Sequence, residues 1–298
     1  MSNSAESPAV TDAAPRWGMT DEELATYPIV FAPNLFAGKT AIISGGGSGI
    51  GKAMTFLFAR LGANVVICSR SEDKLARTQA AVKQHLGKDI DHLAMTIRNP
   101  DEVSALMDQT WERFGGADIL INNAGGQFPQ AALDYSVKGW NAVIDTNLNG
   151  TWYMMQAAAR RWVDAGTAGS IVNIVANVTR GMPQVAHTCA ARAGVIYLSK
   201  SVSTEWAPKG IRVNCVSPGS IDTEGLNVYP DGAAERFCDS NPMRAMGDGY
   251  DIAQATAYLC APTGKFITGE VLTVDGGNNQ WGDTWPGGVP DDFKVNFD

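Results

Sequence analysis

The sequence predicts an α/β fold in which one parallel sheet is covered by helices on both faces. Short apolar runs, such as Thr40–Ser44 and Asn64–Ser69, are nearly continuous, as in strands that are buried on both sides. Segments of helical periodicity follow them, at 50–61 and Glu72–Leu86. This alternation, with right-handed crossovers, gives a doubly wound sheet that binds ligands outside the carboxyl ends of its strands. The remaining expected strands are 92–97, 118–122, 170–176, 212–217 and Val271–Val274.

Composition and charge narrow the classes of partner. The chain has 298 residues, 45% of them hydrophobic, and a formal net charge of −8. A surface of that sign repels phosphate backbones, so we expect neither a nucleic-acid nor a membrane partner. No apolar run approaches the ~18 residues of a membrane-spanning helix. The five cysteines are widely spaced and the sequence has no cluster at metal-ligand spacing, which predicts reduced thiols, no metal and a cytoplasmic location.

The regular alternation predicts a single domain over residues 38–277. Residues 1–37 are expected to form an N-terminal arm, partly disordered at first and extended from residue 17. Between residues 219 and 249 the alternation is interrupted by a stretch of mixed polarity with several glycines. A long irregular insert of this kind is typical of a substrate lid. Residues 278–298 are expected to form a C-terminal tail.

A glycine-rich turn follows the first expected strand and opens the first expected helix. Glycines here let the backbone approach a pyrophosphate, which the free N–H groups and the dipole of the helix N-terminus stabilise. This context predicts the dinucleotide-binding loop of a Rossmann fold. The residues expected to hold the cofactor are Ser44, Gly45, Ser48, Gly49, Ile50 and Gly51.

The end of the second expected strand indicates which dinucleotide binds. A carboxylate there would bond the ribose 2′-hydroxyl of NAD, whereas an arginine accommodates a 2′-phosphate. The sequence has Ser69 and Arg70 at this point, a hydroxyl and a guanidinium without a carboxylate. This favours NADPH over NADH, the alternative being an arginine on a solvated loop.

Five motifs occur in order along the chain: the glycine-rich turn 44–51, Asn-Asn-Ala-Gly at 122–125, Asn147, Pro-Gly at 218–219 and Asp-Gly-Gly at 275–277. Together they resemble the motif set of the short-chain dehydrogenase/reductase family. The resemblance implies a seven-stranded parallel sheet, a nicotinamide dinucleotide, and a homo-oligomer, either a dimer or a tetramer. Further cofactor-binding residues implied by it are Ile97, Asn123, Ala124, Gly125, Pro218, Gly219 and Ile221.

The expected catalytic helix departs from the family's usual set of Asn, Ser, Tyr and Lys. The sequence contains no Tyr-x-x-x-Lys: Thr188 stands where the tyrosine is expected and Arg192 where the lysine is expected. Residues 175–177 offer no hydroxyl for the serine, and Asn147 alone is unchanged. A threonine hydroxyl is a far weaker acid than an activated tyrosine, and arginine does not release its proton at working pH. Ordinary ketone–alcohol chemistry is therefore in doubt.

Reduction of a conjugated C=C bond does not need a strong acid at the substrate oxygen. Hydride goes to the β-carbon, and negative charge builds on the thioester oxygen as an enolate, which donors in a dry pocket stabilise. We expect Asn147 and Thr188 to supply donors, and Arg192 to bond the nicotinamide ribose and add positive charge. His187 is a further candidate proton donor, against the alternative of a structural histidine.

The stretches 123–128, 138–143, 190–195 and 266–269 are similar to the branch of this family that contains peroxisomal trans-2-enoyl-CoA and 2,4-dienoyl-CoA reductases. That resemblance implies an NADPH-dependent reductase of an enoyl thioester, with a CoA-linked substrate, in fatty-acid or related acyl metabolism. The alternatives are a carbonyl, hydroxyacyl or hydroxysteroid oxidoreductase with an atypical acid such as His187, and a catalytically silent dinucleotide-binding protein. Residues 295–298 are not a peroxisomal address, which favours the cytoplasm.

Overall fold

The computed structural model describes residues 17–228 and 234–280 and contains a seven-stranded, all-parallel sheet. Its strand order is β3-β2-β1-β4-β5-β6-β7, which confirms the doubly wound Rossmann fold. The winding reverses between β1 and β4, so their following loops diverge and leave room for a ligand. The strands are β1 (Thr40–Ser44), β2 (Asn64–Ser69), β3 (Asp91–Ala94), β4 (Ile119–Asn122), β5 (Gly169–Ile174), β6 (Ile211–Pro218) and β7 (Val271–Val274).

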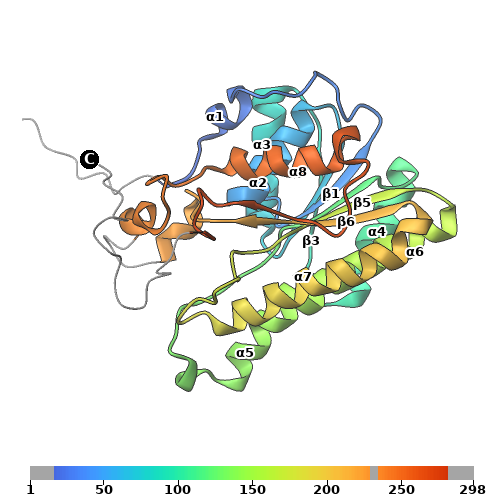
Figure 1. Cartoon of the computed structure of the whole chain (residues 1–298). Helices are drawn as coiled ribbons and strands as arrows, with labels where there is room; N and C mark the ends of the chain where they lie inside the picture. Colours follow the sequence, from blue (N-terminus) through green and yellow to red (C-terminus); the bar gives the residue numbers. More distant parts are fainter. Residues whose placement is uncertain (1–16, 229–233, 281–298) are drawn as a thin grey trace, which may run out of the picture.

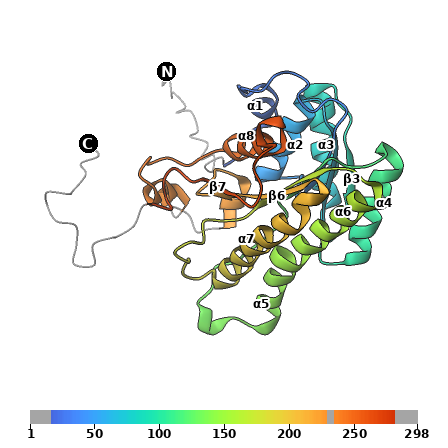
Figure 2. The same ribbon diagram turned by 45° about the vertical axis from the view of Figure 1, so that its right-hand side comes forward.

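Helices cover both faces of this sheet (Figure 1). On one face α2, α3 and α8 enclose a hydrophobic core that includes Phe56 and Tyr250, while α4, α6 and α7 enclose a second core around Trp162. Helix α5 packs beside the first turns of α7, away from the sheet (Figure 2). The helices are α1 (Asp21–Thr26), α2 (Gly49–Arg60), α3 (Glu72–Leu86), α4 (Pro100–Phe114), α5 (Val137–Ile144), α6 (Thr151–Ala165), α7 (Ala186–Trp206) and α8 (Gly249–Cys260).

Short 3-10 turns and one π-helical turn complete the architecture. None of the helices within the described ranges is both long and apolar enough to cross a membrane. The 3-10 turns are η1 (Ala132–Asp134), η3 (Ala207–Lys209), η4 (Glu224–Val228), η5 (Ala234–Ser240) and η6 (Pro262–Gly264), and the π-helical turn is η2 (Asp145–Gly150).

The third strand is shorter than the sequence predicted. Strand β3 ends at Ala94, which pairs with Ser69 at the end of β2, whereas we expected a strand over 92–97. The reason is the start of α4: the carboxylate of Glu102 accepts the backbone N–H of Thr96 at 2.8 Å and turns the chain away from the sheet. Residues 95 and 97 are buried but lie in a loop. Their apolar side chains alone suggested a strand.

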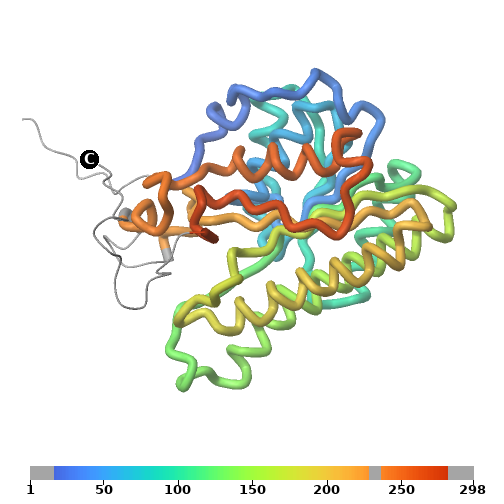
Figure 3. Tube along the Cα trace, viewed as in Figure 1, coloured from blue at the N-terminus to red at the C-terminus, as the bar shows by residue number. Residues whose placement is uncertain are grey.

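The N-terminal arm is not extended throughout, which corrects the expectation for residues 17–37. Helix α1 lies within it, started by a capping box in which Thr20 and Glu23 bond each other's backbone N–H groups. Leu24 is buried, and the Tyr27 ring stacks on Tyr250 of α8 with centroids 4.6 Å apart. Figure 3 shows the blue arm running beside the orange-red α8. The part of the arm before residue 17 lies outside the described residues.

Candidate functional site

A cleft of about 490 Å³ opens where the winding of the sheet reverses, at the carboxyl ends of β1, β2 and β4. Ligands bind at this position in doubly wound sheets because the loops after the strands separate there. Eight of the predicted cofactor-binding residues line it: Gly45, Ser48, Ser69, Arg70, Ile97, Asn123, Ala124 and Gly125.

The glycine-rich turn has the tight geometry that its sequence requires. Gly45 has a φ of +69°, in the left-handed region that favours glycine. A Cβ at Gly51 would lie 2.0 Å from the carbonyl oxygen of Gly45, so only glycine fits where the helix approaches the turn. Ser44 joins this turn to the next loop, because its hydroxyl accepts the N–H groups of Asn123 and Ala124 at 3.1 and 3.0 Å. The turn and the loop after β4 therefore form one rigid floor to the cleft.

Cationic side chains gather at the end of the cleft near β2. Arg70 is exposed, and Lys74, in the first turn of α3, lines the same cleft together with the hydroxyl residues Ser69 and Ser71. None of the described residues that line the cleft is a carboxylate. This corner has the charge and the donors to hold a phosphate.

Arg192 lies deep at the opposite end of the floor, on α7, and is only 8% exposed. A Cβ at Gly125 would lie 2.1 Å from one of its guanidinium nitrogens, so the absence of a side chain at position 125 gives the guanidinium its place. Within the described residues it forms no ion pair, and its Nη1 has no hydrogen-bond partner. Burial lowers the pKa of Arg192 to about 10, with the neighbouring Cys215 thiol acting in the opposite direction. A buried cation without a counter-charge points to a ligand that brings one.

Asn147 is occupied by the loop beside it. It lies in the π-helical turn η2, and its side-chain oxygen accepts the N–H of Gly126 while its Nδ2 donates to the Gly126 carbonyl, both at 3.0 Å. Both ends of the amide are thus engaged by one backbone residue. We infer that Asn147 shapes the loop over Arg192. Such π turns are frequent at functional sites.

His187 and Thr188 open helix α7 and are both buried. The Nδ1 of His187 accepts the backbone N–H of Thr188 at 2.7 Å, so a neutral imidazole carries its proton on Nε2. Among the described residues Nε2 has no hydrogen-bond partner. The ring stacks on Tyr135, with centroids 4.6 Å apart, and meets Phe128 edge-on. Burial lowers the pKa of His187, with the nearby backbone groups of Phe128 and Val185 acting in the opposite direction, so the neutral form is favoured near neutral pH.

Sequence and structure comparisons agree with this geometry. Residues 45–279 match the family model described as "Enoyl-(Acyl carrier protein) reductase". That range covers most of the chain, including every motif from the glycine-rich turn to Asp275. The chain belongs to the short-chain dehydrogenase/reductase family. It is accordingly an oxidoreductase, and a Rossmann fold in this family implies a nicotinamide dinucleotide cofactor.

Individual relatives match between 81% and 92% of this chain. The peroxisomal 2,4-dienoyl-CoA reductase of Danio rerio is 34% identical over 278 residues, 92% of this chain and 92% of that protein. The 3-oxoacyl-(acyl-carrier-protein) reductase of Chlamydia muridarum is 35% identical, over 82% of this chain and 98% of that protein. A crystal structure of a short-chain dehydrogenase from Bacillus anthracis is 41% identical and superposes with a TM-score of 0.74, over 81% of this chain and 96% of that one.

The remaining family motifs lie at the end of β6, beside the cleft rather than in its lining. The N–H of Gly219 donates to the carbonyl of Val274 at 2.9 Å, and a Cβ at Gly219 would lie 2.6 Å from the Cα of Asp275. Ile221 forms a parallel bridge with Gly247. The Pro218–Gly219 and Asp275–Gly277 motifs of this short-chain dehydrogenase/reductase thus hold each other in place.

Sequence reasoning missed Glu224 and six of the residues that line the cleft, which are Cys68, Ser71, Lys74, Met95, Thr96 and Thr146. Ser71 and Lys74 follow the expected Arg70 by one and four positions, and their place at the helix start could have indicated them, since the first turn of α3 faces the end of β2. Glu224 could not have been found this way. Its carboxylate reaches the first helical N–H of α2 from 175 residues further along the chain.

Proposed function

We propose that this short-chain dehydrogenase/reductase reduces the conjugated C=C bond of an enoyl thioester, of the trans-2-enoyl-CoA or 2,4-dienoyl-CoA type, with NADPH. The observation on which the proposal rests is the buried guanidinium of Arg192, which has no ion pair among the described residues, in a site where threonine stands in place of the family's tyrosine. An always-charged group next to a weak acid suits a reaction that builds an anion and needs no strong acid. The relative from Danio rerio, named as a 2,4-dienoyl-CoA reductase, supports the same reaction class.

The cleft supports the choice of NADPH. Ser69, Arg70, Ser71 and Lys74 would surround a phosphate on the adenosine ribose, and none of the described residues that line the cleft is a carboxylate that could bond a 2′-hydroxyl instead. At the other end, Arg192 lies beneath Gly125 and would bond the nicotinamide ribose. When bound, the reduced nicotinamide supplies the hydride.

The chain's own groups would stabilise the charge that the reduction creates. The guanidinium of Arg192 favours negative charge on the thioester oxygen, because it is held in a dry, low-dielectric place. The hydroxyl of Thr188, four residues earlier on the same helix, would donate to that oxygen. The Nε2–H of His187 would add a hydrogen bond to that oxygen without releasing its proton, and the α-carbon would take up a proton from water. Asn147 is a positioning residue in this scheme, because Gly126 engages its amide.

Carbonyl reduction is the second candidate. The relative named 3-oxoacyl-(acyl-carrier-protein) reductase, at 35% identity, favours it, with His187 as the acid. Burial lowers the pKa of His187, which leaves little imidazolium at neutral pH and makes this reaction the weaker choice.

A paired assay separates the two candidates. Crotonyl-CoA, 2,4-hexadienoyl-CoA and acetoacetyl-CoA are each offered with NADPH, and oxidation is followed at the nicotinamide absorbance. We expect turnover with at least one of the two unsaturated thioesters and little with acetoacetyl-CoA. Faster turnover of acetoacetyl-CoA would replace the proposal by carbonyl reduction.

We further propose that the protein is a cytoplasmic homodimer or homotetramer, with residues 219–249 as a lid over the acyl chain. In the described part of this segment Leu226 is buried, which suits a lid with an apolar inner side. Light scattering coupled to size exclusion measures the oligomeric state directly.

A further inference from the structure

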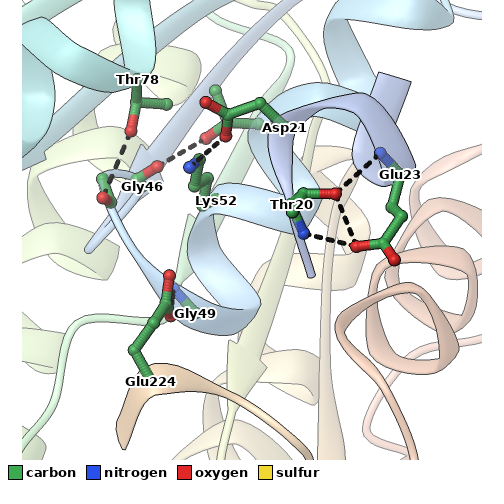
Figure 4. Close-up of polar contacts among 10 residues, drawn as sticks. Thr20, Asp21, Glu23, Gly46, Gly49, Lys52, Thr78 and Glu224 are labelled. Atoms are coloured by element: carbon green, nitrogen blue, oxygen red, sulfur yellow. Dashed lines mark hydrogen bonds and ion pairs between the residues drawn. The ribbon is translucent and has the colours of Figure 1, made fainter. Parts of the chain in front are cut away.

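The N-terminus of α2 is contacted by a carboxylate from a distant part of the chain. The backbone N–H of Gly49, the first residue of α2, donates to Oε2 of Glu224 at 2.9 Å (Figure 4). Glu224 begins the turn η4 in the segment after β6. This N–H belongs to the end of the glycine-rich turn, where the free N–H groups and the helix dipole attract anions. A carboxylate therefore satisfies one of the donors on which the binding of a pyrophosphate depends.

The N-terminal arm holds that carboxylate in place. The N–H of Gly18 donates to the side chain of Asp222 at 2.7 Å, and a Cβ at Gly18 would lie 3.3 Å from the backbone nitrogen of Glu224. The arm is itself tied to α2 by an ion pair between Asp21 and Lys52 (Figure 4). Residues 222–224 are thus enclosed between the arm on one side and the start of α2 on the other.

We propose that Glu224 competes with the cofactor's pyrophosphate for the N-terminus of α2. Two negative groups at one helix terminus repel each other, so either the carboxylate leaves Gly49 or the phosphates bind beside it at a cost in affinity. When the carboxylate leaves, residues 222–224 lose their attachment to α2. Cofactor binding therefore releases the segment after β6 from that helix. The inference rests on the dinucleotide binding proposed above.

A substitution at position 224 can separate the effect of the negative charge from the effect of the side chain's shape. Glu224→Gln keeps a side-chain oxygen that can accept the Gly49 N–H but removes the negative charge. Glu22→Gln is the matched control, because Glu22 is an exposed carboxylate in α1, next to Glu23, which bonds Thr20. Both variants change the net charge of the full chain by the same amount.

The measurement is the Kd of NADPH for the substrate-free full-length enzyme, by titration calorimetry, in wild type and both variants. We expect Glu224→Gln to lower the Kd roughly two- to fivefold, the range for an exposed charge at a helix terminus, and Glu22→Gln to leave it unchanged. Added salt should narrow the difference, because screening weakens an exposed charge. Asp222→Ala, which frees the arm from the segment, should shift the Kd in the same direction.

Hydrogen exchange gives a readout that a purely structural role would not produce. In wild type, NADPH should speed exchange in peptides that cover residues 18 and 222–226, whereas in Glu224→Gln the same peptides should respond less. An unchanged or raised Kd in Glu224→Gln, with wild type binding NADPH, overturns the competition while the proposed function stands. Absence of NADPH and NADH binding by both wild type and Glu224→Gln overturns both.

Discussion

The cationic side chains at the two ends of the cleft differ in how deeply they are buried. Arg70 and Lys74 are exposed at the end of β2, where water solvates their charges and holding them costs little. Arg192 is buried on α7 without an ion pair among the described residues, which is a costly arrangement for a protein to maintain. The exposed pair is suited to choosing between cofactors. The buried cation is suited to stabilising charge that develops during a reaction.

The sharpest test of this contrast removes the buried charge. Arg192→Met should lower kcat/KM for the enoyl thioester by about 2–4 kcal/mol of transition-state stabilisation, and should weaken NADPH binding as well. Arg192→Lys should retain part of the activity, because the charge survives and the bidentate geometry is lost. Steady-state kinetics and NADPH titrations measure both. If Arg192→Met turns over like wild type, Arg192 is only a charge on the helix. That result would favour the alternative of a catalytically silent dinucleotide-binding protein.

The same residue makes a prediction about pH. Burial lowers the pKa of Arg192 to about 10, so the group stays cationic below that pH and loses its charge as the pH rises through it. The pH profile of activity should therefore show no titration assignable to Arg192 between about pH 6 and 9, because arginine titrates above that range. In Arg192→Lys, activity should fall at a lower pH than in wild type. The ordinary pKa of lysine is below that of arginine, and burial lowers it further.

The fit between Gly125 and Arg192 can be tested without touching the charge. Gly125→Ala places a methyl group 2.1 Å from the present position of a guanidinium nitrogen and should displace it, which should lower kcat/KM by up to about 100-fold, the loss that a misplacement of about 1 Å can cause. Gly126→Ala is the matched control, since nothing lies within 4 Å of a Cβ there. Thermal unfolding of both variants shows whether the fold is intact. Equal activity of the two would mean that the guanidinium's present position is unimportant.

Thr188 is expected to matter less than the charge behind it. Thr188→Ala should lower kcat by about 1.5–3 kcal/mol, the range for a hydrogen bond to a charged group, and leave the NADPH Kd nearly unchanged. Thr188→Ser keeps the hydroxyl and should keep most of the rate. If the alanine variant is as fast as wild type, Thr188 has no part in the reaction.

The smallest effect is expected at the exposed end. Arg70→Asp should weaken NADPH by about 1–2 kcal/mol, after allowance for solvent screening, and should change NADH binding little. Lys74→Met should act in the same direction and more weakly. Kd values for both cofactors in each variant give the measurement, and equal losses for NADPH and NADH would contradict the assignment of this corner to a 2′-phosphate.

The sequence by itself determined the fold and eight of the residues that line the cleft. Buried parallel strands need continuous apolar runs, and a turn as tight as Gly45–Gly51 requires glycine, so both are visible as local patterns. Strand β3 was overestimated because Met95 and Ile97 are buried in a loop, and local hydrophobicity cannot distinguish the two cases. Helix α1 was missed, although its Thr20–Glu23 capping box can be read in the sequence.

Only the tertiary structure decided what the polar groups do. The pattern placed Asn147 and Arg192 at the site, but the fold commits the Asn147 amide to Gly126 and buries the Arg192 guanidinium, which has no ion pair in the part of the chain that the structure describes. It also brings Glu224 to Gly49 and Gly18 to Asp222. These contacts join segments that are far apart in the chain, across loops whose conformation no local periodicity encodes. Burial, desolvation and free hydrogen-bonding capacity depend on such contacts, and they exist only once the chain has packed.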